Sequence, residues 1–183
     1  MINIARKKWP NNNTEFYVMD MSDLSFFKKN NFDVIISLFG SFSHVLDPAK
    51  AIVEIERVLK PGGTLFLMVY SKYSIKNLFD CLIKLSLKYI NEVHPYEIRR
   101  TSAPLFVDAR FYTTNSICDY FKGFTDLKVG GLNAFLEIPF LRNKFLAPEK
   151  FNKSKHLLLK ERLILRNQDL FHSLIIRGKK NEN

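Results

Sequence analysis

Unbroken apolar runs alternate with segments of helical period in the first half of the chain. Residues 32–40, FDVIISLFG, and 64–70, TLFLMVY, are each nearly continuously apolar. Such runs are typical of strands covered on both faces in a parallel sheet. Between them, apolar residues recur at helical spacing after Asp47 and Pro48, which suit a helix N-terminal cap and first turn. The pattern predicts a strand, a helix and a second strand.

The tetrapeptide Lys-Pro-Gly-Gly, residues 60–63, joins that helix to the second strand. Pro61 disfavours helical geometry at Lys60, and two glycines permit the positive φ angles that reverse a chain. The tetrapeptide is therefore predicted to end the helix and make a tight turn.

The rest of the chain alternates in the same way, although residues 91–110 give few periodic signals and are predicted as loop. Alternating strands and helices favour an α/β layer fold with a mainly parallel sheet. The predicted strands are 15–20, 125–132 and 170–178; the predicted helices are 74–90, 113–123 and 155–167, with a helical turn at 24–29.

The composition is that of one globular domain, with 46% hydrophobic and 25% charged residues. No apolar run reaches the length of a membrane span and none resembles a secretory signal, so we expect a cytoplasmic protein. The net charge of +10 lies mainly in residues 71–183. A compositional bias explains this excess of positive charge better than nucleic-acid binding does, because aromatic and basic residues are not interleaved. Lone cysteines and scattered histidines predict no metal site.

Three sequence blocks follow one another in the first 69 residues: FYVMDMSDL at 16–24, FDVIISLFGSFSHV at 32–45 and AKAIVEIERVLKPGGTLFLMV at 49–69. Together they resemble the class I S-adenosylmethionine-dependent methyltransferases, especially the small-molecule group. The resemblance implies a Rossmann-like α/β fold, with a mainly parallel sheet and a C-terminal antiparallel strand, in a single domain over residues 1–183. It also implies S-adenosylmethionine as cofactor and a small-molecule acceptor.

The resemblance assigns the cofactor site to two segments. Asp20 would accept a hydrogen bond from the adenine amino group, with the Met21 amide beside it. Ser37, Leu38 and Phe39 would line the methionine portion, at the end of a strand where ligands of open α/β sheets bind. The alternative for Asp20 is a turn-forming role.

The acceptor side would involve residues further along. His44 would stand near the transferred methyl group and is the best candidate base, because imidazole titrates near neutral pH; the alternative is a half-buried loop residue. Tyr70 and Tyr73 would orient the acceptor or serve as wall. Segments 71–110 and 133–167 are the expected substrate-side or lid segments, and their apolar residues either cover a lipophilic acceptor or pack on the core.

The chain departs from the family at its start. The first glycine is Gly40, so the family's glycine-rich loop and the following ribose-binding acid have no counterpart. Family sheets have strand order 3-2-1-4-5-7-6, and loss of the first βαβ portion would leave 15–20 unpartnered and 32–40 at an exposed edge. We therefore expect an N-terminally truncated methyltransferase with impaired methyl transfer, possible complementation by an N-terminal fragment, or alternatively a non-catalytic remnant or interaction protein.

Overall fold

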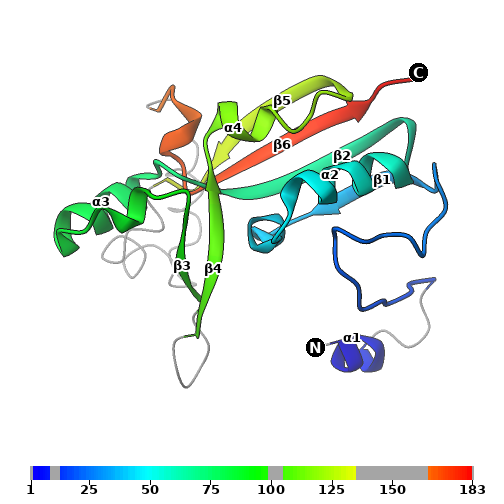
Figure 1. Cartoon of the computed structure of the whole chain (residues 1–183), viewed down its shortest axis with the longest axis horizontal. Helices are drawn as coiled ribbons and strands as arrows, with labels where there is room; N and C mark the ends of the chain where they lie inside the picture. The colour runs from blue at the N-terminus through cyan, green and yellow to red at the C-terminus, as the bar shows by residue number, and fades with distance from the viewer. Residues whose placement is uncertain (1, 9–12, 99–104, 135–164, 183) are drawn as a thin grey trace, which may run out of the picture.

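The computed structural model describes residues 2–8, 13–98, 105–134 and 165–182, and shows one sheet with helices packed on it (Figure 1). Figure 1 shows α2 lying across β1 and β2. The described elements, in chain order, are α1 (Ile2–Lys8), β1 (Phe32–Ser37), η1 (Ser41–His44), α2 (Pro48–Val58), β2 (Leu59–Ser71), α3 (Ile75–Lys84), η2 (Leu87–Ile90), β3 (Val93–Ile98), β4 (Leu105–Tyr112), α4 (Thr114–Cys118), β5 (Phe124–Leu132), η4 (Gln168–Leu170) and β6 (Ser173–Lys180).

The long strand β2 organises the sheet. It pairs in parallel with β1 on one side and antiparallel with β6 on the other, and β5 adds to β6 antiparallel. At its C-terminal end β2 also pairs in parallel with β4, through Tyr70 and Ser71, and β3 and β4 form an antiparallel pair. The order β1-β2-β6-β5 matches the order 4-5-7-6 that the resemblance implies for this part of the sheet. The α/β fold class and the antiparallel C-terminal strand are confirmed. The sheet was expected to be mainly parallel and is mixed, because β6, β5 and β3 all pair antiparallel.

Helix α2 starts and packs as its sequence predicts. The Asp47 carboxylate accepts from the Lys50 amide at 3.0 Å, and Pro48 occupies the first turn. The apolar stripe of α2 covers alternate residues of β2, which exclude water on that side of the sheet. The buried residues at this contact are Ala51, Ile52 and Ile55 of α2 and Leu65, Leu67 and Val69 of β2.

The predicted helix stop is confirmed, but residues 60–63 form a bulge within β2 instead of the predicted tight turn. The backbone is already extended at Leu59, directly after α2. The pairing with β1 then jumps from Leu59 to Thr64, so the four residues between bulge out of the ladder, with Gly62 at φ 73°. The Lys180 ammonium of β6 contacts the start of this bulge, donating to the Leu59 carbonyl at 2.7 Å.

The predicted strand at 15–20 is wrong. These residues have no regular secondary structure, and the described part of the chain pairs no strand with them. Aromatic and β-branched residues favour extended backbone, but a strand needs a neighbour to hydrogen-bond. The expected exposed edge is present, because β1 pairs with β2 alone among the described strands. On one face of β1, Val34 and Ile36 are also 49% and 61% exposed. Burial on both faces, as the sequence of β1 predicts, is therefore wrong for one face.

Two further predictions need correction. The predicted helix 74–90 ends at Lys84, because Leu85 adopts φ 45°, and a 3₁₀ turn follows. The helix buries Asn77 and exposes apolar residues such as Leu82. Residues 91–110, predicted as loop, contain β3 and most of β4. The predicted helix 155–167 lies mostly outside the described residues. Among the helices described, none is long and apolar enough to cross a bilayer.

Candidate functional site

Two consecutive left-handed residues turn the chain at the carboxyl end of β1. Phe39 has φ 56° and Gly40 has φ 72°. The turn leads into η1, where the fully buried Phe42 anchors the loop in the core. The Phe39 ring, in contrast, is 83% exposed. A left-handed conformation is unusual for a bulky residue and marks a position held by its surroundings.

Tyr70, near the end of β2, holds this loop in place. Its amide donates to the Ser43 hydroxyl at 3.0 Å, and its own hydroxyl donates to the Phe39 carbonyl at 3.2 Å. The loop packs so closely on the ring that a Cβ atom added at Gly40 would lie 2.3 Å from Cζ of Tyr70. Tyr70 is itself buried. The buried ring of Tyr70 therefore supports the loop from Phe39 to Ser43.

His44 lies at the end of η1 beside the same ring. Its Nδ1 is 3.1 Å from the Asp108 carbonyl oxygen, and its ring meets that of Tyr70 edge to face at 5.7 Å. A carbonyl only accepts, so Nδ1 carries the hydrogen and Nε2 is the basic nitrogen of the neutral ring. The structure thus brings His44 and Tyr70 together at the carboxyl ends of β1 and β2.

Two aromatic neighbours of this pair, and a third ring stacked on one of them, were not predicted from the sequence. The Tyr70 ring lies 5.7 Å from Phe111 of β4 and 5.7 Å from His172, which precedes β6. His94 of β3 stacks on Phe111 at 3.7 Å, with an angle of 10° between the rings. These residues come from segments far apart in the chain, and no spacing in the sequence indicated their contact.

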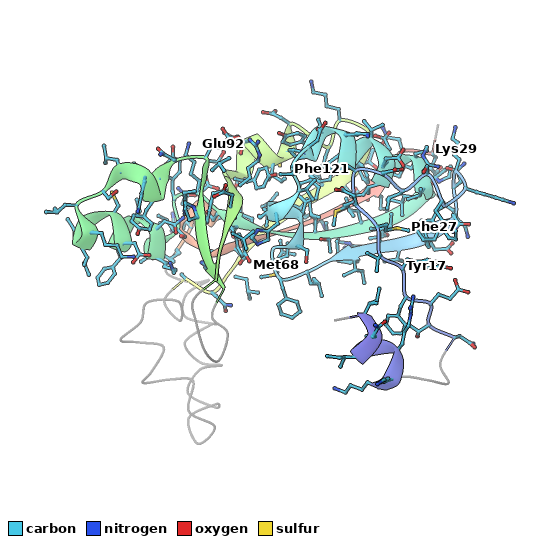
Figure 2. The ribbon with its side chains drawn as sticks, turned by 60° about the horizontal axis from the view of Figure 1, so that its bottom comes forward. Tyr17, Phe27, Lys29, Met68, Glu92 and Phe121 are labelled. Atoms are coloured by element: carbon cyan, nitrogen blue, oxygen red, sulfur yellow. The ribbon has the colours of Figure 1, made fainter. Side chains whose placement is uncertain are left out.

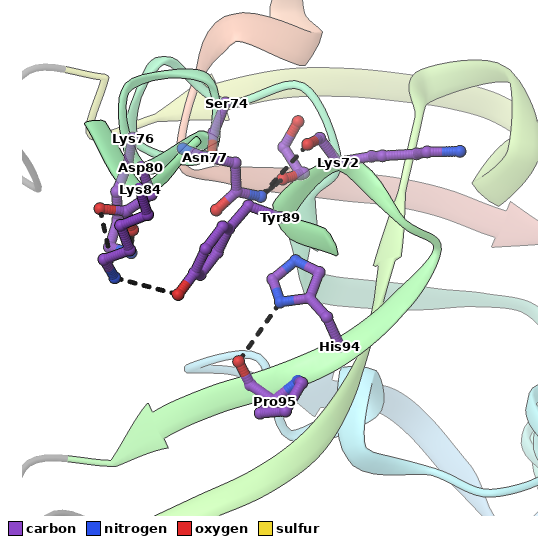
Figure 3. A network of polar contacts seen from close by, with 10 residues as sticks. Lys72, Ser74, Lys76, Asn77, Asp80, Lys84, Tyr89, His94 and Pro95 are labelled. Atoms are coloured by element: carbon purple, nitrogen blue, oxygen red, sulfur yellow. Dashed lines mark hydrogen bonds and ion pairs between the residues drawn. The ribbon is translucent and has the colours of Figure 1, made fainter. Parts of the chain in front are cut away.

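The buried ring of His94 resists protonation. Burial lowers the pKa of its imidazole; the charge of Lys76 acts in the same direction, while the Pro95 carbonyl, 3.3 Å from Nδ1, opposes it. Figure 3 shows His94 beside Tyr89, whose hydroxyl accepts from Lys84 at 3.1 Å. Nε2 of His94 is buried and has no hydrogen-bond partner among the described residues.

Ser37 and Leu38 lie directly before the turn. The Ser37 hydroxyl is buried and has no hydrogen-bond partner within the described parts of the chain. Leu38 is exposed, and its carbonyl accepts from the Ser41 hydroxyl at 2.8 Å. An unpaired buried hydroxyl next to an exposed apolar side chain fits a ligand with both polar and apolar groups, such as the methionine end of the cofactor.

Asp20 is exposed and shapes a turn of its own. Its carboxylate accepts from the Ser22 amide at 2.8 Å and from the Ser22 hydroxyl at 2.7 Å. These hydrogen bonds lower the pKa of Asp20, so the group is an anion and an acceptor at neutral pH. The side chain of Met21 packs against the core. Asp20 therefore stabilises a turn with Ser22, and its carboxylate remains exposed.

An ion pair on α2 fixes the segment that carries Asp20. Glu54 and Arg57 pair at 2.8 Å, and Glu54 accepts from the Leu24 amide at 2.9 Å. The Arg57 guanidinium donates to the carbonyls of Leu24 and Phe27, at 2.8 and 2.9 Å. Loop residues after Asp20 are therefore positioned by a helix of the core, without a strand.

Tyr73 lies apart from the predicted site residues. It is exposed, and the Lys72 ammonium stands 5.4 Å from its ring centroid. None of the contacts described for it reaches Tyr70 or His44. Within the described residues, no group of His, Cys, Asp and Glu could hold a metal ion.

The residues present fit two ends of S-adenosylmethionine. Asp20 offers an acceptor for an amino group, and the Ser37 hydroxyl and Leu38 offer polar and apolar contacts at the end of β1. The described residues before β1 contain no glycine, so they form no glycine-rich backbone turn.

The class I methyltransferase fold has a parallel strand–helix–strand unit, an antiparallel C-terminal strand and a loop at the carboxyl ends of the strands. This chain has all three features. The family model "Methyltransferase domain" matches residues 1–67, which include β1, α2 and most of β2. The ubiquinone/menaquinone biosynthesis C-methyltransferase UbiE of Wigglesworthia glossinidia brevipalpis is 35% identical over 118 residues. Over these regions the chain is similar to the class I S-adenosylmethionine-dependent methyltransferases.

The matched region is 52% of this chain and 47% of the Wigglesworthia protein, so the chain spans about half the length of that curated relative. Solved structures show the same fold. A putative methyltransferase of Haloferax volcanii, in complex with the Trm112 activator, has a TM-score of 0.59 at 18% identity, over 100% of this chain and 68% of its own. A Thermotoga maritima methyltransferase, a possible histamine N-methyltransferase, has a TM-score of 0.57 at 21% identity, over 99% and 69%.

Proposed function

We propose that this chain takes part in methyl transfer from S-adenosylmethionine to a small molecule, contributing the adenine and methionine contacts and the acceptor side of the site. The observation that carries this proposal is the loop from Leu38 to His44. It is folded against Tyr70 at the carboxyl ends of two parallel strands, where ligands of such sheets bind.

Asp20 would accept a hydrogen bond from the adenine amino group. Ser37 and the backbone and side chains of Leu38 and Phe39 would contact the methionine portion. Bound S-adenosylmethionine supplies a methyl group already activated by the sulfonium, so the protein has mainly to position the acceptor in line with it.

His44 would act only where the acceptor loses a proton. Because Nδ1 donates to the Asp108 carbonyl, Nε2 is the nitrogen that would take that proton as the acceptor gains the methyl group. The hydrogen bond to Asp108 also sets the ring orientation. Tyr70 would hold the loop in position, and Tyr73, which lies apart, would contact only an extended acceptor.

Cofactor binding tests the proposal directly. S-adenosylmethionine titrated into the chain by calorimetry should bind, and Asp20→Ala should weaken binding by about tenfold, the size of one charge-assisted hydrogen bond. Asp23→Ala is the matched control, because Asp23 is an exposed acid with a similar hydrogen bond to the Ser25 amide, at 3.2 Å. Equal losses in both variants would contradict the role of Asp20.

The alternative is a non-catalytic remnant or interaction protein. The lack of a glycine-rich turn among residues 13–31 favours it, because close backbone approach to the cofactor depends on such a turn. A folded chain that binds no S-adenosylmethionine, alone or with the partner considered next, would support this alternative.

A further inference from the structure

The sheet has one covered face and one bare face. Odd-numbered residues of β2, such as Leu65 and Leu67, are fully buried against α2, while the even-numbered Phe66 and Met68 are only partly buried. Figure 2 shows Phe121 on the side of α2 and Met68 on the opposite side. Strands in a parallel arrangement are normally covered on both faces, so the face with Met68 lacks its cover among the described helices.

Cross-strand pairing gathers apolar residues on this bare face. Ile36 of β1 pairs with Phe66, and Met68 pairs with Ile175 of β6. Directly opposed residues share a face, so these side chains form one patch together with Val34. We call this patch the bare face; it consists of Val34, Ile36, Phe66, Met68 and Ile175.

Basic residues border the bare face on the side away from β1. Arg177 pairs with Phe66 and places its guanidinium 5.8 Å from that ring, and Lys179 pairs with Thr64. Lys128 of β5 pairs with Arg177. A helix lying on the bare face would therefore need an apolar stripe facing β1 and β2, and acidic residues facing β6 and β5.

The edge next to the bare face is also open. In the described part of the chain, β1 pairs with β2 alone. Alternate backbone N–H and C=O groups of β1 therefore point away from β2, available to another strand. Asp33 is the charged residue on this strand, and Lys60 pairs with it at 2.8 Å. The consecutive Val34, Ile35 and Ile36 leave the middle of the edge without a protecting charge.

We propose that the open edge of β1 and the bare face bind a strand–helix unit of a complementing polypeptide. Its strand would pair in parallel with β1, and its apolar helix, with an acidic flank, would cover Ile36, Phe66 and Met68. This inference rests on the proposed function, since the unit that fits is the N-terminal half of a methyltransferase domain, which carries the glycine-rich loop. The Haloferax and Thermotoga structures align with nearly all of this chain over 68% and 69% of their own length, so about a third of each lies outside the shared part.

A second copy of this chain fits less well. Two β1 edges related by a twofold axis would pair antiparallel, and each copy would bring no described helix to the other's bare face. Its basic border would also meet the same basic residues of the partner or remain unmatched. A strand–helix unit satisfies the edge, the apolar patch and the basic border together.

The test uses the full chain and, as the partner, the part of the Wigglesworthia relative that carries the family's glycine-rich loop, produced as a separate polypeptide. Native mass spectrometry should show a one-to-one complex, and hydrogen exchange should show new protection of the β1 amides. Ile36→Lys should weaken the complex at least about tenfold, because it places a charge in a buried apolar contact. Val53→Lys is the matched control: Val53 is 63% exposed on α2, away from the bare face.

Three results would overturn the inference. The first is a folded chain that forms no complex; the second is a complex weakened equally by both lysine variants. The third is self-association of the chain alone that Ile36→Lys abolishes, which would assign the bare face to a second copy. None of these readouts needs the cofactor. A complex that forms but binds no S-adenosylmethionine would contradict the proposed function and support the docking surface. Cofactor binding by the chain alone, with no complex formed, would support the proposed function and contradict the docking surface.

Discussion

Gly40 is the residue on which the geometry of the candidate site depends most directly. Its φ of 72° is in the left-handed region, and an added Cβ would lie 2.3, 2.4 and 2.7 Å from Cζ, Cε1 and the hydroxyl oxygen of Tyr70. The backbone conformation costs an L-residue about 1–2 kcal/mol. Forcing a methyl group into a packed site costs about 1–3 kcal/mol more. Gly40→Ala should therefore lower the free energy of unfolding by about 2–5 kcal/mol.

Two other glycines separate these contributions. Gly62 has the same backbone conformation, with φ 73°, but the nearest atom to an added Cβ is Glu182 Oε1 at 3.8 Å. Gly62→Ala should cost about 1–2 kcal/mol, the conformational part alone. Gly130 in β5 has ordinary φ and nothing within 4 Å of an added Cβ. Gly130→Ala should be neutral or stabilise by about 0.5–1 kcal/mol.

Urea denaturation followed by circular dichroism measures all three variants, and each kcal/mol should also lower Tm by about 2–4 °C in a chain of this length. In a Tyr70→Ala background, Gly40→Ala should cost no more than Gly62→Ala, because the ring that it meets is gone. A cost for Gly40→Ala equal to that of Gly62→Ala in the wild-type background would refute the close packing of the loop on Tyr70.

Three further predictions concern the frame around the site. The lowered pKa of His94 means that the folded state favours the neutral ring. Its contribution to stability is therefore complete above the ordinary pKa of about 6.5 and is lost as pH falls toward the folded pKa. His94→Gln should flatten the decline in unfolding free energy over that pH range. Lys180→Met leaves the Leu59 carbonyl without its donor and should cost about 1–3 kcal/mol in urea denaturation. Arg57→Leu removes the hydrogen bonds to the loop after Asp20, so hydrogen exchange there should become faster while the core stays protected.

Each of these predictions has a result that contradicts it. An unchanged pH dependence in His94→Gln would mean that other groups cause the acid destabilisation. A Lys180→Met variant as stable as Lys179→Met, which removes an exposed lysine next to it, would show that the buried hydrogen bond is weak. Exchange in the loop that is as fast in Lys60→Leu as in Arg57→Leu would show a general effect of lost charge, because Lys60 pairs with Asp33 on the surface.

Local chemistry explains which elements could be predicted. The start of the helix after Asp47 and its end before Pro61 follow from a cap and from backbone preferences, which act between neighbouring residues. The segment 15–20 has the composition of a strand but no neighbouring strand among the described residues. A strand needs such a neighbour for its backbone hydrogen bonds, so strand propensity alone was not enough. Strand β3 was not predicted because it contains Pro95, and proline is confined to edge strands. β3 does lie at an edge, since it pairs only with β4 among the described strands.

The same distinction applies to the site. His44 and Tyr70 were predicted through the family resemblance, and the structure adds the contact between them. His94, Phe111 and His172 had no local signal, because their grouping depends on the β3–β4 hairpin and the start of β6 meeting at the end of β2. Contacts between segments so distant in sequence are set by topology, which spacing alone does not reveal.

The position of the bare face relative to the cofactor residues leads to a last prediction. β1 carries the open edge and ends at Ser37, so a strand docked on β1 would lie beside the residues assigned to the methionine portion. A cofactor held jointly by this chain and by a glycine-rich turn must bind the complex more tightly than either piece. By thermodynamic linkage it must then tighten the complex by the same factor, typically about 5–150-fold. Titrating the complementing polypeptide with and without S-adenosylmethionine measures that factor, and equal dissociation constants would show that the cofactor does not bridge the two pieces.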